Sequence, residues 1–319
     1  MKILITGGGG FVGSHLAEAE LNAGNEVVAW DVSGPEKVAH LINRPKMTYV
    51  RGDLKDPLLE DMIKNADLVF HLAAIASVYV YCTNPKKVLE TNVEGTARMV
   101  RLCHAYKKKI VFSSSSEIYG RNPRVPWPEE SQSVMDTPER TRWCYSASKI
   151  IGEHYLHAYK MEGLKMAICR FFNFYGPRLD QLDPKGRVIT CFLDKFLKNE
   201  TVEVVAPGDQ SRCFTHIRDG VNGIMMVGHN PAAEGQAFNI GDDTETTILD
   251  LAQMIKRIGN FSSKIEVVPA KKLYGDGYED IFRRVPDNRK ARNVLGWKPE
   301  ISLEDGLKET IEHFKQSGK

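Results

Sequence analysis

Residues 2–31, KILITGGGGFVGSHLAEAELNAGNEVVAWD, place two short apolar runs on either side of a glycine-rich turn and a helix-forming stretch. KILIT and EVVAWD are continuous apolar runs, which are typical of strands buried on both faces of a parallel sheet. Gly7, Gly10 and Gly13 follow the first run directly, with the spacing GxxGxxG. Strand, tight turn, helix and strand make one βαβ unit, so this stretch predicts a doubly wound α/β fold.

The same alternation continues through the first half of the chain. The apolar stretches TYVRGD, ADLVFHLAA, KIVFSSSS and KMAICRFFN are separated by amphipathic segments, with helices expected near residues 85–105 and 143–161. Such strands and helices predict a parallel sheet with helices on both faces. We therefore expect a Rossmann-type dinucleotide-binding domain over residues 1–173.

After Gly176 the pattern becomes irregular and polar, and a second region begins. Helices expected near 189–198, 248–258 and 303–314 alternate there with short strands. The stretch FTHIRDGVNGIMMVG looks like one strand and one helix returning to the first sheet. We expect a smaller α/β substrate domain over residues 174–319, from which about 212–230 return to the first domain.

Charge and composition exclude several classes of function. Lys and Arg number 43 against 41 Asp and Glu, a formal net charge of +2, without a block of like charge that would favour a nucleic-acid partner. No apolar run approaches the ~20 residues that span a bilayer, and KILIT follows Met1 without a basic signal segment, so we expect a cytoplasmic protein with no membrane contact. The six cysteines lack CxxC spacing and the histidines lack HExxH spacing, so we predict no metal site.

The glycine-rich turn predicts a dinucleotide cofactor. Glycines at these positions allow a tight turn, a close approach of the backbone to a pyrophosphate, and a helix N-terminus that faces the phosphates. Asp31 closes the second strand, where a carboxylate accepts hydrogen bonds from both hydroxyls of the adenosine ribose and repels a 2′-phosphate. The predicted cofactor is therefore NAD rather than NADP, with Phe11 and Val12 at the start of the helix among its contacts.

Two further strand ends are candidates for the same cofactor site. Asp53 and Leu54 in RGDL are placed to bracket the adenine, and Ala73 and Ala74 in HLAA are small enough for the backbone to approach the cofactor. Ordinary packing at strand ends is the alternative for these four residues.

Tyr145 and Lys149 in YSASK are the candidate catalytic pair. Side chains four positions apart lie one turn apart on the same helix face. An ammonium group beside a phenol favours the phenolate, which is able to remove a hydroxyl proton while a hydride leaves the same carbon. Ser115, from the preceding strand end, is expected to hold the substrate oxygen.

With these motifs the chain resembles the extended short-chain dehydrogenase/reductase superfamily, in its branch of nucleotide-sugar epimerases, dehydratases and decarboxylases. The resemblance covers essentially the whole length. It implies catalytic roles for Tyr145, Lys149 and Ser115 and oxidation of a nucleotide-linked sugar at C4. It also implies a homodimer formed through the helices near 88–105 and 145–159.

Glu117 is the position that separates the reactions of this branch, because 4-epimerases of this kind usually have a small residue there. A carboxylate implies chemistry at C5 or C6. If C6 is a carboxylate, the C4 ketone makes the sugar a β-keto acid that loses carbon dioxide. If C6 is an alcohol, Glu117 removes H5 and water leaves; Ser116 stands where many such dehydratases have Asp.

Longer stretches favour decarboxylation. RWCYSASK, FNFYGPRLD, SRCFTHIRDG and YGDGYEDIFRRVPDNRKARNVLGW resemble UDP-glucuronate decarboxylases. That resemblance places Arg284 near the sugar carboxylate, although a surface pairing with Asp280 or Asp287 is the alternative. It further implies a set of residues that line the sugar and nucleotide sites, namely Tyr81, Ser116, Asn173, Arg187 and Arg212, with Arg178 as a weaker candidate.

Three hypotheses remain open from the sequence. The first is an NAD-dependent UDP-glucuronate decarboxylase that yields UDP-xylose or its 4-keto form. The second is a 4,6-dehydratase or 4-epimerase for another nucleotide sugar, including a UDP-glucuronate or UDP-hexose 4-epimerase. The third is a non-catalytic NAD-sensing protein on the same fold.

Overall fold

A seven-stranded parallel sheet forms the centre of the molecule in a computed structural model that describes residues 1–179, 187–274 and 281–316. Its strand order is β11-β6-β5-β4-β1-β2-β3, so successive strands are added outward on both sides of β1. The doubly wound fold predicted from the sequence is confirmed. The strands are β1 (Lys2–Thr6), β2 (Glu26–Asp31), β3 (Met47–Arg51), β4 (Leu68–His71), β5 (Lys109–Ser115), β6 (Met166–Phe171) and β11 (Ala237–Ile240).

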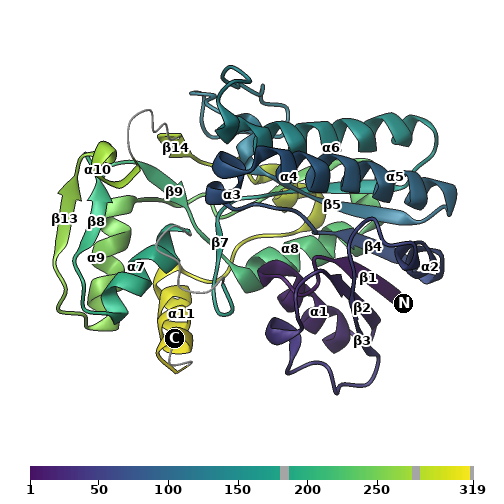
Figure 1. The fold of residues 1–319 in the computed structure, drawn as a ribbon, viewed down its shortest axis with the longest axis horizontal. Helices are drawn as coiled ribbons and strands as arrows, with labels where there is room; N and C mark the ends of the chain where they lie inside the picture. The colour runs from purple at the N-terminus through teal and green to yellow at the C-terminus, as the bar shows by residue number, and fades with distance from the viewer. Residues whose placement is uncertain (180–186, 275–280, 317–319) are drawn as a thin grey trace.

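Helices cover both faces of this sheet (Figure 1). One layer contains α1 (Phe11–Asn22) and α8 (Ile217–His229), and the other contains α2 (Leu58–Asn65), α5 (Gly95–Ala105) and α6 (Cys144–Met161). Ile3 and Ile5 belong to the core beneath the first layer, whereas Leu4 belongs to the core beneath the second. Burial on both faces explains why the central strands contain continuous apolar runs.

The helix expected near residues 85–105 is interrupted by a wider turn. It is built from α4 (Pro85–Leu89), a π-helical turn at Glu90–Glu94, and α5. The short helix α3 (Val78–Thr83) precedes it. Asn92, inside the π-helical turn, is buried and uses its side chain to bind both the N–H and the carbonyl of Ile75. The turn therefore fixes the loop that follows β4.

The smaller region lies beside the carboxyl ends of the central strands (Figure 1). It contains three small sheets: β7 (Phe174–Tyr175) with β10 (Thr215–His216), β8 (Val202–Val205) with β13 (Ile265–Val268), and β9 (Ser211–Cys213) between β12 (Glu245–Thr247) and β14 (Arg283–Arg284). Its helices are α7 (Val188–Leu197), α9 (Ile248–Gly259), α10 (Ala270–Tyr274) and α11 (Leu303–Gln316). Trp297 and Leu307 share a core with Ile3, so the two regions pack as one body.

Short 3-10 or π turns complete the described chain: Glu36–Val38, Ser116–Tyr119, Thr141–Trp143, Pro231–Ala233 and Ala291–Leu295. None of the helices in the described ranges is long and apolar enough to cross a membrane. In the same ranges, no group of three or more His, Cys, Asp or Glu side chains is arranged to hold a metal ion.

Candidate active site

The glycine-rich turn between β1 and α1 leaves no room for side chains. Gly7 has a φ of +75°, and a Cβ there would lie 2.7 Å from the backbone nitrogen of Ala73. A Cβ on Gly13 would overlap the carbonyl oxygen of Gly7. The first turn of α1 therefore packs directly on the loop, and its N-terminal N–H groups face the carboxyl edge of the sheet, where a pyrophosphate is able to bind.

Asp31 lies beside this turn, at the end of β2. Its Oδ2 accepts a hydrogen bond from the Gly9 N–H at 3.0 Å, and its Oδ1 accepts from the N–H and hydroxyl of Ser33 at 2.9 and 2.7 Å. These bonds orient the carboxylate, and they leave acceptor capacity on Oδ2 for a ribose hydroxyl. The tightly packed glycine turn and the oriented carboxylate of Asp31 together fit NAD.

The other expected cofactor contacts surround the same edge. Ala73 touches the Gly7 turn, with Ala74 next to it, while Phe11 is buried at the start of α1. Leu54 is buried against Gly95 of α5. Asp53 uses its Oδ1 to accept from the Lys55 N–H at 2.8 Å, which stabilises its own turn.

Tyr145 and Lys149 are both buried on α6, one turn apart. Lys149 Nζ donates to the carbonyl oxygen of Ser113 at 2.6 Å and lies 5.9 Å from the centroid of the Tyr145 ring. A hydrogen bond joins the side chains of Tyr145 and Ser115. The structure therefore brings the three groups of the predicted acid–base set together at the end of β5.

The charge states of this pair differ from the expectation. Burial raises the pKa of Tyr145 to about 12, against the opposing effects of the Ser115 hydrogen bond, Arg187 and Arg284. Burial also lowers the pKa of Lys149 to about 7, with Glu153 acting in the opposite direction. The sequence argument expected the ammonium to favour the phenolate; in the structure, loss of hydration is the largest effect on the Tyr145 pKa, and it favours the phenol.

Glu117, in the 3-10 turn after β5, is the centre of a cluster of charges. Its Oε2 receives a hydrogen bond from Arg142 Nη1 at 2.9 Å and another from the Ser146 hydroxyl at 3.2 Å, while Arg284 Nη1 forms an ion pair with Oε1. Burial by itself would raise the pKa of Glu117, but Arg284 and Arg142 outweigh it and lower the pKa to about 2. The carboxylate is therefore ionised at any physiological pH. Ser116 is buried beside it.

Arg142 was missed by the sequence analysis. It stands three residues before Tyr145 in the quoted stretch RWCYSASK, on the approach to α6, and reaches back to Glu117 across 25 positions of the chain. The sequence signal that could have identified it was its position just before α6.

The structure does not place Arg284 on the surface. Arg284 is buried and pairs with Glu117, whereas Asp287 pairs with Arg289 at 2.5 Å; Asp280 lies outside the described residues. Strand β14 runs parallel to β9, with Arg284 opposite Arg212. The two expected anion-binding arginines are thus neighbours in one small sheet.

The remaining candidates line the space around these groups. Tyr81 is buried and stacks on Tyr145, with ring centroids 5.6 Å apart and planes 18° apart. Asn173 donates to the Cys213 carbonyl at 2.9 Å. The Arg187 guanidinium lies 5.5 Å from the centroid of the Phe11 ring, so it faces the start of α1.

Two arginines among the candidates are tied to their own surroundings. Arg212 donates to the carbonyls of Ser211 and Phe282 at 2.8 and 3.1 Å. Arg178 turns toward α1, where it pairs with Glu18 at 2.6 Å.

Comparisons with known proteins agree with this geometry. Residues 3–241 match the model of the NAD dependent epimerase/dehydratase family. The UDP-glucose 4-epimerase of Thermotoga maritima, solved with UDP-glucose, is 29% identical over 100% of both chains, with a TM-score of 0.85. The UDP-glucuronic acid 4-epimerase of Bacillus cereus, solved with UDP-glucuronic acid and NAD, is 27% identical over 99% of this chain and 100% of that one, with a TM-score of 0.88.

A third similar structure extends the range of sugars. The UDP-N-acetylglucosamine 4-epimerase of Methanobrevibacter ruminantium, in complex with UDP-N-acetylmuramic acid, is 27% identical over 99% of this chain and 98% of that one, with a TM-score of 0.89. All three of these proteins are described as epimerases rather than decarboxylases. The family match spans most of the chain and includes the glycine turn, Asp31, Tyr145 and Lys149, so this protein belongs to the NAD-dependent epimerase/dehydratase family.

Proposed function

We propose that this protein oxidises a UDP-linked sugar acid at C4 and then removes its C6 carboxylate, converting UDP-glucuronate to UDP-xylose or its 4-keto form. The observation that carries the proposal is the convergence of Arg142 and Arg284 on Glu117, beside Tyr145. Guanidinium groups bind carboxylates through paired, charge-assisted hydrogen bonds, so this cluster is suited to hold the C6 carboxylate of a sugar acid.

The first step uses the groups at the end of β5. In its phenolate form, Tyr145 removes the proton of the C4 hydroxyl, and Ser115, already bonded to Tyr145, orients the sugar oxygen. Lys149 holds its amine beside the tyrosine ring, fixed by the Ser113 carbonyl. Bound NAD supplies the acceptor for the hydride that leaves C4.

The second step breaks the bond between C5 and C6. With a ketone at C4, the electron pair of that bond moves toward the ketone oxygen as carbon dioxide leaves, and C5 later takes up a proton. The product at this point is the 4-keto pentose; UDP-xylose results only if the hydride is returned to C4 while Tyr145 gives its proton back to the C4 oxygen. The hydroxyls of Tyr145 and Ser115 are placed to stabilise the negative charge on that oxygen. Arg142 and Arg284 hold the carboxylate before it leaves.

A 4-epimerase acting on a sugar acid is the second candidate, and the similarity to the Bacillus cereus enzyme favours it. The same two arginines would then hold a carboxylate that remains on the sugar. A 4,6-dehydratase is less well supported, because Glu117, with a pKa of about 2, is a weak base for removing H5. A non-catalytic NAD-binding protein would not require Tyr145, Lys149 and Ser115 to lie together.

Incubation with NAD and UDP-glucuronate labelled with ¹³C at C6 distinguishes these candidates. Decarboxylation releases the label as carbon dioxide and yields a pentose nucleotide in the NMR spectrum. Conversion to UDP-galacturonate with the label retained would identify a 4-epimerase and contradict the decarboxylase proposal. A parallel panel of UDP-, GDP- and dTDP-hexoses, followed by mass, reports loss of water if the protein is a dehydratase.

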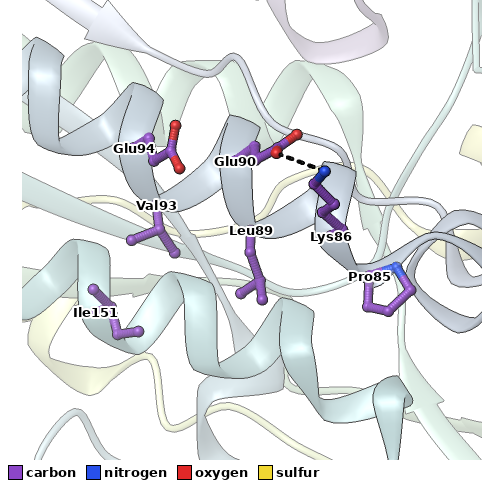
Figure 2. A pocket seen from close by; sticks show the side chains of 7 residues that line it. All are labelled: Pro85, Lys86, Leu89, Glu90, Val93, Glu94 and Ile151. Atoms are coloured by element: carbon purple, nitrogen blue, oxygen red, sulfur yellow. Dashed lines mark ion pairs between the residues drawn. The ribbon is translucent and has the colours of Figure 1, made fainter.

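We also propose that two copies associate through α4, the π-helical turn and α6. Figure 2 shows Leu89, Val93 and Ile151 pointing into the groove between these helices, which Pro85, Lys86, Glu90 and Glu94 also line. Leu89 and Ile151 are 39% and 37% exposed and line this groove together with Val93, so they form one apolar surface. At the rim, Lys86 and Glu90 pair with each other at 3.7 Å, which leaves the apolar side chains as the surface that a second copy would cover.

A further inference from the structure

Asn239 lies outside the proposed reaction but connects the segments that carry the charge cluster. It belongs to β11, the edge strand of the central sheet, and is completely buried. Its Nδ2 donates to the carbonyls of Trp127 and Asp287 at 2.8 and 3.1 Å, and its Oδ1 accepts from the Tyr119 hydroxyl at 2.7 Å. One amide thus binds three separate segments of the chain.

Two of those segments lead directly to the ion pair of Glu117 with Arg284. Tyr119 shares the 3-10 turn Ser116–Tyr119 with Glu117. On the other side, the Trp127 N–H donates to the Val285 carbonyl and the Asp287 N–H donates to the Trp127 carbonyl, both at 2.9 Å. Val285 follows Arg284 without a gap.

The same contacts continue to the catalytic helix. Asn239 pairs in register with Arg170 of β6, and Arg170 Nη1 donates to the same Tyr119 hydroxyl at 2.9 Å. Arg170 also forms a bidentate pair with Glu153, one turn after Lys149 on α6, at 2.9 and 2.6 Å. The Asn239 N–H donates to the Glu129 carboxylate at 2.8 Å. Every polar group that contacts Asn239 in this buried network therefore has a hydrogen-bond partner.

We propose that Asn239 is a positioning residue: it holds the segment of Arg284 against the turn of Glu117 and so sets the preference of the site for a sugar acid over a neutral sugar. This inference rests on the proposed function. An arginine discriminates a carboxylate only when its guanidinium is held in place, because a mobile side chain loses entropy on each binding event. Asn239 supplies that restraint through the backbone on both sides of the ion pair.

Asn239→Asp is the direct test, since it keeps the shape of the side chain. It replaces the Nδ2 group, which donates two hydrogen bonds, by an oxygen that faces the carbonyl oxygens of Trp127 and Asp287. Dissociation constants are measured by calorimetry on NAD-loaded protein in a Tyr145→Phe background, which prevents turnover. We expect the affinity for UDP-glucuronate to fall about tenfold, the order for one orphaned buried polar group, with the affinities for UDP-glucose and UDP unchanged. An equal loss for UDP-glucuronate and UDP-glucose would overturn the positioning role.

Two further variants keep the test decisive. Ile240→Val, a neighbouring core change on the same strand, should lower stability without altering the ratio of the two affinities. If Asn239→Asp does not fold, Tyr119→Phe is used instead, because it removes the hydroxyl that donates to Asn239 Oδ1. The same selective loss of affinity for UDP-glucuronate is expected.

Amide hydrogen exchange tests the restraint by Asn239 independently of the proposed substrate. In Asn239→Asp, residues 282–288 should exchange faster than in Ile240→Val, whatever sugar the protein uses. Protection equal to that of Ile240→Val would contradict the restraint itself. A parent protein that shows the restraint but no preference for UDP-glucuronate would instead contradict the proposed substrate.

Discussion

Lys149 directs its amine at the carbonyl oxygen of Ser113, 2.6 Å away, and both groups are buried. The contact fixes the amine beneath the Tyr145 ring while burial disfavours its charge. The amine is thus poised to titrate near neutral pH, with a pKa of about 7.

Lys149 should make the unliganded protein more stable as the pH rises from about 7 to 10. Folding lowers the pKa of Lys149, so within that window the unfolded chain binds more protons than the native one. The free energy of unfolding therefore rises by up to about 1.4 kcal/mol per pH unit. Denaturant unfolding of the parent and of Lys149→Met at several pH values measures the difference. Parallel curves for the two proteins would contradict a lowered pKa.

Tyr145→Phe should lower the rate of sugar oxidation by about 10²-fold or more, since it removes the group that takes the hydroxyl proton. NAD affinity should remain unchanged, because the ring and its stacking with Tyr81 are kept. Single-turnover formation of NADH checks the rate, and fluorescence titration checks the affinity. Tyr155→Phe, on the same helix, is the matched control; a normal rate in Tyr145→Phe would remove the acid–base assignment.

Glu117→Gln should destabilise the unliganded protein by about 3 kcal/mol, because the buried Arg284 and the half-buried Arg142 lose their shared counter-ion. UDP-glucuronate should restore more of that stability than UDP-glucose at equal occupancy, since its carboxylate replaces the lost charge. Thermal unfolding with each nucleotide sugar measures the recovery. Equal recovery by both would show that the arginines do not contact the sugar acid.

The Glu117 charge also predicts a dependence on acid. Its folded pKa of about 2 is below the ordinary 4.5, so its contribution to stability is complete above about pH 4.5 and is lost as the pH falls toward 2. The difference in unfolding free energy between the parent and Glu117→Gln should therefore shrink over that interval. A constant difference from pH 5 to 2.5 would argue against the ion pairs.

Gly13→Ala should abolish NAD binding, since the added methyl group overlaps the Gly7 carbonyl and moves α1 away from the turn. Gly24→Ala is a suitable control: it has a φ of +84° and open space around it, so it should cost about 1 kcal/mol of stability and leave NAD affinity intact. Calorimetric titration with NAD compares the two. Tight binding by Gly13→Ala would place the dinucleotide elsewhere.

Ile151→Glu, alone or with Leu89→Glu, should convert the proposed dimer to a monomer by placing charge in the apolar groove of Figure 2. Light scattering after size exclusion gives the mass directly. Met161→Glu is the control, because Met161 is exposed at the far end of α6 and is not part of the groove. A monomeric parent protein would contradict the assembly.

Local patterns were sufficient for the cofactor half of the molecule. The glycine spacing and Asp31 are contiguous in the chain, and the helices expected near 143–161 and 248–258 agree with α6 and α9 to within a residue. In each case the deciding interactions lie within one βαβ unit or one helix. Strand β11 was not singled out, because AFNI is short and joins the sheet only through β6, some 70 residues earlier.

The sugar half could be predicted only through resemblance. Arg142 and Arg284 meet at Glu117 from separate parts of the chain, and no spacing rule connects them. The direction of the Tyr145 pKa was also unpredictable, since the spacing gives the neighbouring amine but not the degree of burial, which is the largest effect on that pKa. Both depend on tertiary packing rather than on local sequence.

The two-residue strand β14 places Arg284 opposite Arg212 and leaves Arg283 to pair with Glu245. Adjacent residues of a strand point to opposite sides. A slip of a single position along β9 would exchange the two arginines, turning the buried guanidinium outward and the solvent-facing one inward. Insertions or deletions between β13 and β14 are therefore expected to be tolerated only when this alignment is preserved, so the proposed binding of a sugar acid would depend on strand phase as much as on residue identity.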